Sequence, residues 1–260
     1  PFWKVYKLTV SGFALNYATP VGLMGGEPYR IMELTPYVGA SKATSSVILY
    51  VMMHIFSHFC FWFFSIFLYL ALRPVDIAMG TILAVVGAVS LLAIYFFMKG
   101  YKNGMAVRTL KLLQHIPFIK EWAKRFSENK REALERVDSQ IAELHKQRRS
   151  TFYASLSLEF MARIIGCLEV YFILNILTTD VSFPACILIM AFTSLFANLF
   201  FFSPMQLGAR EGGFALAVGG LAIPGAFGVY TGLITRVREL IWIVIGVLLM
   251  KVGNGTPANK

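Results

Sequence analysis

The sequence predicts an all-α, polytopic integral membrane protein built from two similar halves. Hydrophobic residues fill 57% of the 260 positions and charged residues only 15%, below the roughly one quarter typical of a soluble domain. Four runs contain no Asp, Glu, Lys or Arg: 43–72, 77–98, 181–209 and 212–235. A spanning helix needs about 20 apolar residues, so each run is long enough. We therefore expect five or six transmembrane helices and two broken or re-entrant segments.

Residues 1–98 are predicted to form the first membrane half. A moderately apolar helix over 2–19 begins with aromatic residues and Lys, as at a membrane interface, and ends at Pro20. Residues 20–42 are rich in Gly and Pro, which predicts a broken helix or a re-entrant loop. The half is then completed by a helix over 43–72, a tight turn at Arg73-Pro74 and a helix over 76–98.

A basic loop is predicted over residues 99–150. Within 99–149, 13 Lys and Arg face 6 Asp and Glu, so this loop holds +7 of the net charge of +10. Such loops are retained in the cytoplasm, and they attract anionic lipid. Interspersed apolar residues predict amphipathic helices over 105–126 and 127–147. Because the charge lies between hydrophobic runs, we expect no nucleic-acid partner.

Residues 151–252 repeat the order of the first half. We expect helices over 151–178 and 181–203, a Gly- and Pro-rich broken segment over 204–225, and a final helix over about 227–251. The tail over 253–260 has the composition of a loose end. The chain begins at Pro1 rather than at a methionine, so the sequence leaves open whether further helices precede it.

The two broken segments carry matching motifs. In each, a Glu follows a Pro by seven positions, with Gly between or directly after them: Pro20, Gly25, Gly26 and Glu27 in the first, and Pro204, Gly208, Glu211 and Gly212 in the second. Interrupted backbone is tolerated in a membrane only where it is buried in protein or lines a cavity. Matched broken segments in two halves are typical of the binding site of a transporter.

Together the motifs resemble the membrane region, or flippase-like domain, of the lysylphosphatidylglycerol synthase family. The resemblance covers nearly the whole chain and rests on Thr19-Pro20, Gly25-Gly26-Glu27, Arg30, Pro204, Gly208, Arg210-Glu211-Gly212 and Arg236. One position departs from it: Leu49-Tyr50 stands where family members often carry a charged pair.

The resemblance implies movement of a phospholipid, or of a polyprenyl-type carrier lipid, between leaflets. In that family the synthase activity resides in a separate soluble domain, and the longest polar stretch here, about 50 residues, is too short for it. We therefore expect a lipid translocator rather than an enzyme. It would act in the cytoplasmic membrane of a bacterium or archaeon, with a separate synthase as a partner and without a cofactor.

Five charged residues in or near the motifs are the predicted substrate-binding residues: Glu27, Arg30, Arg210, Glu211 and Arg236. Ionisable groups at membrane depth mark functional sites by default. An Arg can bind a lipid phosphate through two hydrogen bonds, and a Glu can accept a headgroup amine. The alternative is that these charges only pair with one another and fasten the broken helices. We expect the two halves to bring all five together.

Other polar residues in the apolar runs have simpler interpretations. His54 and His58 are spaced to hold a metal, but their segment offers no further ligand, so hydrogen bonding between helices is favoured over a metal site. Glu159 and Arg163 are predicted to pair locally, leaving Glu169 unpaired. The three cysteines, Cys60, Cys167 and Cys186, are expected to be small buried hydrophobic residues.

Two other functions remain open from the sequence. An intramembrane transferase would act on a phospholipid or polyprenyl phosphate, with Glu27 or Glu211 as the base. A non-catalytic membrane partner would position a separate synthase, and the uncharged Leu49-Tyr50 favours this alternative slightly. The sequence specifies neither the lipid, nor the direction and energy coupling of transport, nor the oligomeric state.

We predict that a cysteine introduced at Asn129 reacts with a membrane-impermeant thiol reagent only from the cytoplasmic side. Positive charge holds the 99–150 loop there. Labelling of intact cells and of inside-out vesicles measures the orientation, and the parent protein with Asn129 intact is the control. Labelling of intact cells from outside would contradict the orientation.

Overall fold

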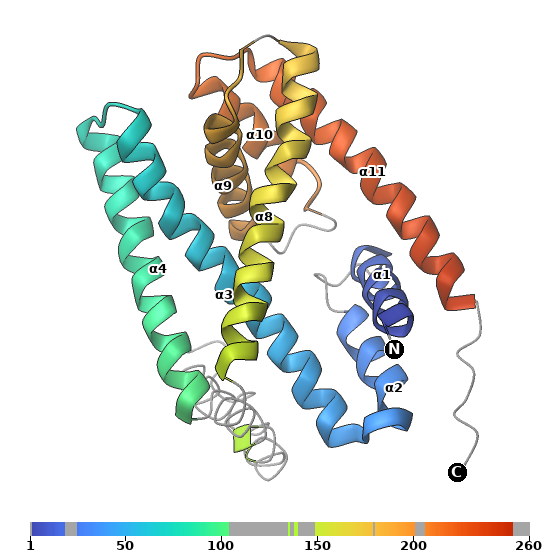
Figure 1. Cartoon of the computed structure of the whole chain (residues 1–260). Coiled ribbons are helices and arrows are strands. Elements are labelled where there is room, and N and C mark those ends of the chain that lie inside the picture. The colour runs from blue at the N-terminus through green and yellow to red at the C-terminus, as the bar shows by residue number, and fades with distance from the viewer. Residues whose placement is uncertain are drawn as a thin grey trace.

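The computed structural model describes residues 2–18, 25–103, 135, 138–139, 149–178, 180–200 and 206–251. Over these ranges the chain is helical, without strands, so the all-α prediction is confirmed (Figure 1). The helices are α1 (Phe2–Ala18), α2 (Gly26–Val38), α3 (Ala40–Leu72), α4 (Ile77–Asn103), α8 (Arg149–Leu177), α9 (Phe183–Leu199), α10 (Ala209–Gly219) and α11 (Gly225–Lys251). Pro20, Pro204, most of the basic loop and the tail lie outside the described ranges.

Three helices are long and apolar enough to cross a membrane: Ala40–Leu72, Ile77–Lys99 and Ser150–Leu177. In the apolar 18-residue stretch of α4, only 6% of the residues are buried inside the protein. Most of this helix therefore faces outward, where the surrounding medium is lipid. The apolar helix α9 is shorter, and α11 has 27 residues but carries charges near its middle. The number of spans beyond these three stays a prediction.

Each predicted broken segment contains a short helix that is separate from the long helix after it. In the first, the 13-residue α2 is separated from α3 by Gly39, whose φ of 82° is a conformation that residues with a Cβ rarely adopt. In the second, the 11-residue α10 is followed by a turn over 220–224 before α11 begins. The prediction of broken helices is confirmed, whereas re-entry into the membrane stays a prediction.

The order of the elements is the same around both motifs. A helix (α1 or α9) leads into the motif, a short helix (α2 or α10) follows it, and a long helix (α3 or α11) comes next. The packing is crosswise, because α1 contacts α11 and α3 contacts α9. The two halves are therefore interlocked, and each long helix packs against the lead-in helix of the other half (Figure 1).

Small residues allow α1 and α11 to approach closely. A Cβ built on Gly246 of α11 would lie 2.6 Å from the carbonyl oxygen of Val10 and 2.6 Å from the Cβ of Ala14. The hydroxyl of Ser11, fully buried, donates a hydrogen bond of 3.1 Å to the carbonyl oxygen of Gly246. Close packing of small residues with an interhelical hydrogen bond is typical of membrane helix pairs.

Apolar clusters join the other helices. Met53, Phe56, Phe97 and Phe152 connect α3, α4 and α8, and a second cluster on α8, α9 and α10 is centred on Leu174. The free cysteines Cys167 and Cys186 are buried and Cys60 is partly buried, as expected for small hydrophobic residues in apolar helices.

We predict that Gly246→Ala lowers the melting temperature, because its Cβ overlaps α1; overpacking of this kind costs about 1–3 kcal/mol. Thermal unfolding in detergent is the measurement. Gly166→Ala is the matched control: a Cβ there meets nothing within 4 Å, and Ala improves helix propensity. Equal melting temperatures for both variants would contradict the close packing of α1 on α11.

Candidate functional site

The second motif becomes the first turn of α10. Gly208 precedes the helix with a φ of 77°, and its N–H donates a hydrogen bond of 2.9 Å to the carboxylate of Glu211. This bond satisfies one of the N–H groups that a helix start leaves without a partner. The turn aims Arg210 and Glu211 toward α11, where a Cβ on Gly232 would lie 3.2 Å from Cα of Glu211.

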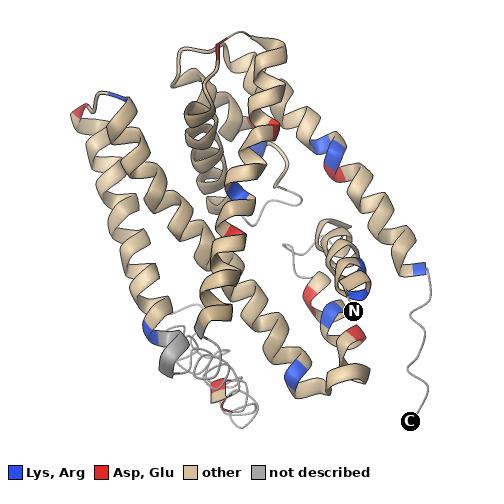
Figure 2. Ribbon diagram, in the orientation of Figure 1, with Lys and Arg blue, Asp and Glu red and all other residues tan. Residues whose placement is uncertain are grey.

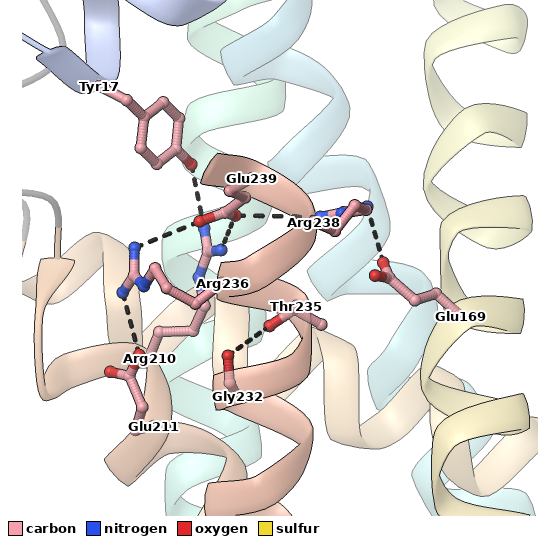
Figure 3. Close-up of polar contacts among 9 residues, drawn as sticks. All are labelled: Tyr17, Glu169, Arg210, Glu211, Gly232, Thr235, Arg236, Arg238 and Glu239. Atoms are coloured by element: carbon pink, nitrogen blue, oxygen red, sulfur yellow. Dashed lines mark hydrogen bonds and ion pairs between the residues drawn. The ribbon is translucent and has the colours of Figure 1, made fainter. Parts of the chain in front are cut away.

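A network of ion pairs connects α10 to the middle of α11 (Figure 3). Arg236 contacts two carboxylates, that of Glu211 at 3.0 Å and that of Glu239 at 3.2 Å. Glu239 also pairs with Arg210, whose other terminal nitrogen donates to the hydroxyl of Tyr17 on α1 at 3.2 Å. The buried carboxylate of Glu239 thus joins α10 to α11, and Arg210 joins both to α1.

The network extends from α11 to α8 through a more open pair. Arg238 lies 2.7 Å from the carboxylate of Glu169 and 3.9 Å from that of Glu239. The side chains of Arg238 and Glu169 are 49% and 26% exposed, whereas those of Arg236 and Glu239 are 10% and 4% exposed. The arrangement therefore has a buried centre and an accessible edge.

The first motif forms a smaller group at the start of α2. Arg30 pairs with Glu27 at 3.2 Å and also donates to the carbonyl oxygen of Thr9 at 3.3 Å. Asn16 of α1 accepts from the N–H of Gly26 at 2.7 Å and donates to Glu27 at 3.1 Å. The backbones approach closely here: a Cβ on Gly26 would lie 2.1 Å from the carbonyl oxygen of Gly12.

The C-terminal end of α1 lies between the two groups. Its neighbouring residues Asn16 and Tyr17 bond to Glu27 of the first group and to Arg210 of the second. The five predicted residues therefore divide into Glu27 with Arg30, and Arg210 with Glu211 and Arg236. Their ion pairs join partners within each half, and α1 is the link between the halves.

Several partners escaped the sequence interpretation. Glu239 pairs with two arginines, and its i, i+3 spacing from Arg236 in an apolar helix is a signal that could have identified it. The prediction that Glu169 is unpaired is wrong, because Arg238 on another helix contacts it. Asn16 and Tyr17 carry no such signal. Among the motif glycines, Gly212 has open space where a Cβ would lie.

Charged side chains gather in the middle of α8 and α11 and on α2, whereas α3 and α4 are uncharged between their ends (Figure 2). Such a pattern defines a helical integral membrane protein with ionisable groups inside its helix bundle rather than in loops alone. Over the described part of the chain, no group of three or more His, Cys, Asp or Glu is arranged to hold a metal ion.

The chain belongs to the lysylphosphatidylglycerol synthase family: the model of that family's transmembrane region matches residues 1–246. The resemblance expected from the motifs is thereby confirmed. No curated protein and no solved structure matches the chain. Membership in this family points to a function that concerns membrane lipids.

We predict that Glu239→Gln destabilises the protein far more than Glu169→Gln. The first leaves Arg210 without its carboxylate and Arg236 with Glu211 alone, and breaking a buried ion pair costs about 3–5 kcal/mol. The second opens a half-exposed pair, for which about 0–1 kcal/mol is usual. Chemical unfolding of both variants in detergent measures the difference. Similar losses in the two variants would contradict the division into a buried centre and an accessible edge.

Proposed function

We propose that the protein translocates a phospholipid or lipid-linked headgroup between leaflets, without chemically changing it. The observation that carries this proposal is the accessible edge of paired charges near the middle of α11, where Arg238 contacts Glu169 of α8. Half-exposed ion pairs are expensive beside lipid tails. They are less costly where they face water or a charged headgroup that can exchange with one partner of each pair.

Burial separates the charged residues that hold the helices together from those that can contact a ligand. Glu239, Arg236 and Arg30 are buried and hold the helices together. Glu27, Arg238 and Glu169 are exposed enough to reach a ligand, and Arg210, 19% exposed, can reach one from the border of the buried centre. The arginines suit the phosphate of a lipid, and the glutamates suit an amine. A headgroup that carries both charges, or an excess of positive charge, fits this edge best.

An apolar groove offers a place for an acyl chain. Its volume is about 210 Å³, and it lies between α3 and α4 of the first half and α9 and α10 of the second. Large apolar side chains line it on both sides, among them Trp62, Leu83, Phe192 and Leu216. A groove shared by the halves would let the tails stay in apolar surroundings while the headgroup meets the charges.

Within this proposal, the protein resides in the cytoplasmic membrane of a bacterium or archaeon, with the 99–150 loop in the cytoplasm against anionic lipid. A separate synthase would supply its lipid. The alternative functions, an intramembrane transferase and a non-catalytic partner of a synthase, differ in outcome. The first produces a new lipid species detectable by mass spectrometry, and the second leaves lipid distribution unchanged when the purified protein is reconstituted alone.

We predict that Arg210→Ala slows lipid translocation by about tenfold or more, which corresponds to losing a charge-assisted hydrogen bond of about 1.5–3 kcal/mol. Liposomes with fluorescent zwitterionic or cationic phospholipids report the rate, and melting temperature is measured on the same sample. Arg73→Gln, in the exposed turn after α3, is the control. Wild-type rates from folded Arg210→Ala protein would end the binding-site proposal and leave Arg210 as a clamp.

A further inference from the structure

A second polar group lies outside the site, where α3 packs against α8. The guanidinium of Arg163 donates to Ser57 at 2.8 Å, to the carbonyl oxygen of His54 at 2.8 Å and to His58 at 3.2 Å. His54 also contacts the carboxylate of Glu159 at 3.3 Å. The hydrogen bonding between helices predicted for the two histidines is thereby confirmed.

His54 occupies the position in the first half that Arg238 occupies in the second. The motifs lie 184 positions apart, since Pro204 follows Pro20 and Glu211 follows Glu27 by that number, and Arg238 follows His54 by the same number. The long helices keep this register to within one residue, because α3 begins at Ala40 and α11 begins 185 positions later, at Gly225.

Both positions face a carboxylate of α8. Arg238 lies 2.7 Å from Glu169, and His54 lies 3.3 Å from Glu159. Helix α8 therefore contacts a basic side chain from each half, with a different carboxylate for each. The chemistry of the two cations differs: Arg keeps its charge at every physiological pH, whereas His gains and loses its charge near neutral pH.

The surroundings of His54 give its Nδ1 atom two competing partners. Oε2 of Glu159 lies 3.3 Å away and accepts a proton, whereas Nη2 of Arg163 lies 3.5 Å away and donates one. An imidazolium carries hydrogen on both ring nitrogens, so its Nδ1 must donate to Glu159, whereas a neutral ring with its hydrogen on Nε2 accepts from Arg163 at Nδ1. The other hydrogen bonds of Arg163 hold it in place in either state.

The two histidines are not equivalent in this arrangement. Nδ1 of His58 faces Arg163 alone and serves as an acceptor, so it has no competing carboxylate. The His54 side chain is 48% exposed and that of Glu159 is 27% exposed. The ring of Tyr50, 6.3 Å from that of His54, lies under the guanidinium of Arg30 and links this group to the first motif.

We propose that His54 and Glu159 form a proton-binding site whose occupancy exchanges the partner of His54 between Glu159 and Arg163. The groups that face His54 are Glu159 and Arg163 of α8 and Tyr50 and His58 of α3, with Arg30 of α2 beyond Tyr50. This proposal rests on the proposed function. His54, the cation of the first half, is charged only when it holds a proton, whereas Arg238, the cation of the second half, is always charged. Proton uptake would then be coupled to lipid movement.

The first arm of the test observes the proton directly. Protein with ¹⁵N-labelled histidine is placed in lipid nanodiscs, and the His54 resonance is assigned by its loss in His54→Gln. Spectra are recorded between about pH 5 and pH 8, the range in which imidazoles in general change charge. We expect the His54 resonance to report the exchange of its partner over this range in the wild type and not in Glu159→Gln, which removes the carboxylate partner. A His54 resonance that does not change over this range overturns the proposal.

The second arm measures translocation in liposomes at the two ends of that pH range. The wild-type rate should change by about five- to tenfold and that of His54→Gln by less than about twofold. His58→Gln is the matched control: it keeps an acceptor for Arg163 and should retain the pH dependence. Equal pH dependence in His54→Gln and wild type overturns the coupling. A wild-type protein that moves no lipid at either pH contradicts the proposed function instead, and the proton site is then decided by the first arm alone.

Discussion

The carboxylate of Glu239 is the interaction on which the arrangement of the second half depends. It is almost fully buried near the middle of α11, and two arginines from two helices converge on it. A charge in apolar surroundings is tolerated only with such partners, so α10 must start where it can present Arg210. Gly208, with a φ of 77°, precedes α10 and places Arg210 in the first turn of the helix, where it reaches Glu239.

Close backbone approach makes this pairing geometrically attainable. Gly232 lets Glu211 lie against α11, and Gly246 lets α1 lie against the same helix, so that Tyr17 reaches Arg210. Small residues and charges therefore work together. The small residues allow the helix backbones to approach closely, and the charges specify which parts of the helices pair. In the first half, Gly12 and Gly26 do the same for Arg30 and Glu27, with Asn16 as the third partner.

Much of the fold could be predicted because apolar runs, breakers and membrane dimensions act locally. The run over 43–72 predicts α3 to within three residues, and Gly- and Pro-rich composition locates both breaks. The site was only half predictable. Arg210 and Glu211 could be identified because they belong to a motif. Tyr17 and Asn16 join the site only through packing between helices, and Tyr17 is nearly 200 residues away in sequence from its partner Arg210. Glu169 lacked a partner on its own helix, and periodicity along one helix contains no information about Arg238 on another.

The two halves share an architecture but not a set of charges, and this asymmetry bears on mechanism. A transporter with two equivalent halves has no internal reason to prefer one state over the other. Here α8 contacts a permanent cation from one half and a histidine from the other. Arg keeps its charge, so the cation that α11 presents to Glu169 is permanent, whereas the charge that α3 presents to Glu159 depends on His54. Within the proposed function, a contact between α3 and α8 that has two states would give a bound lipid an equilibrium to shift, because a ligand can shift only an equilibrium between states that it contacts differently.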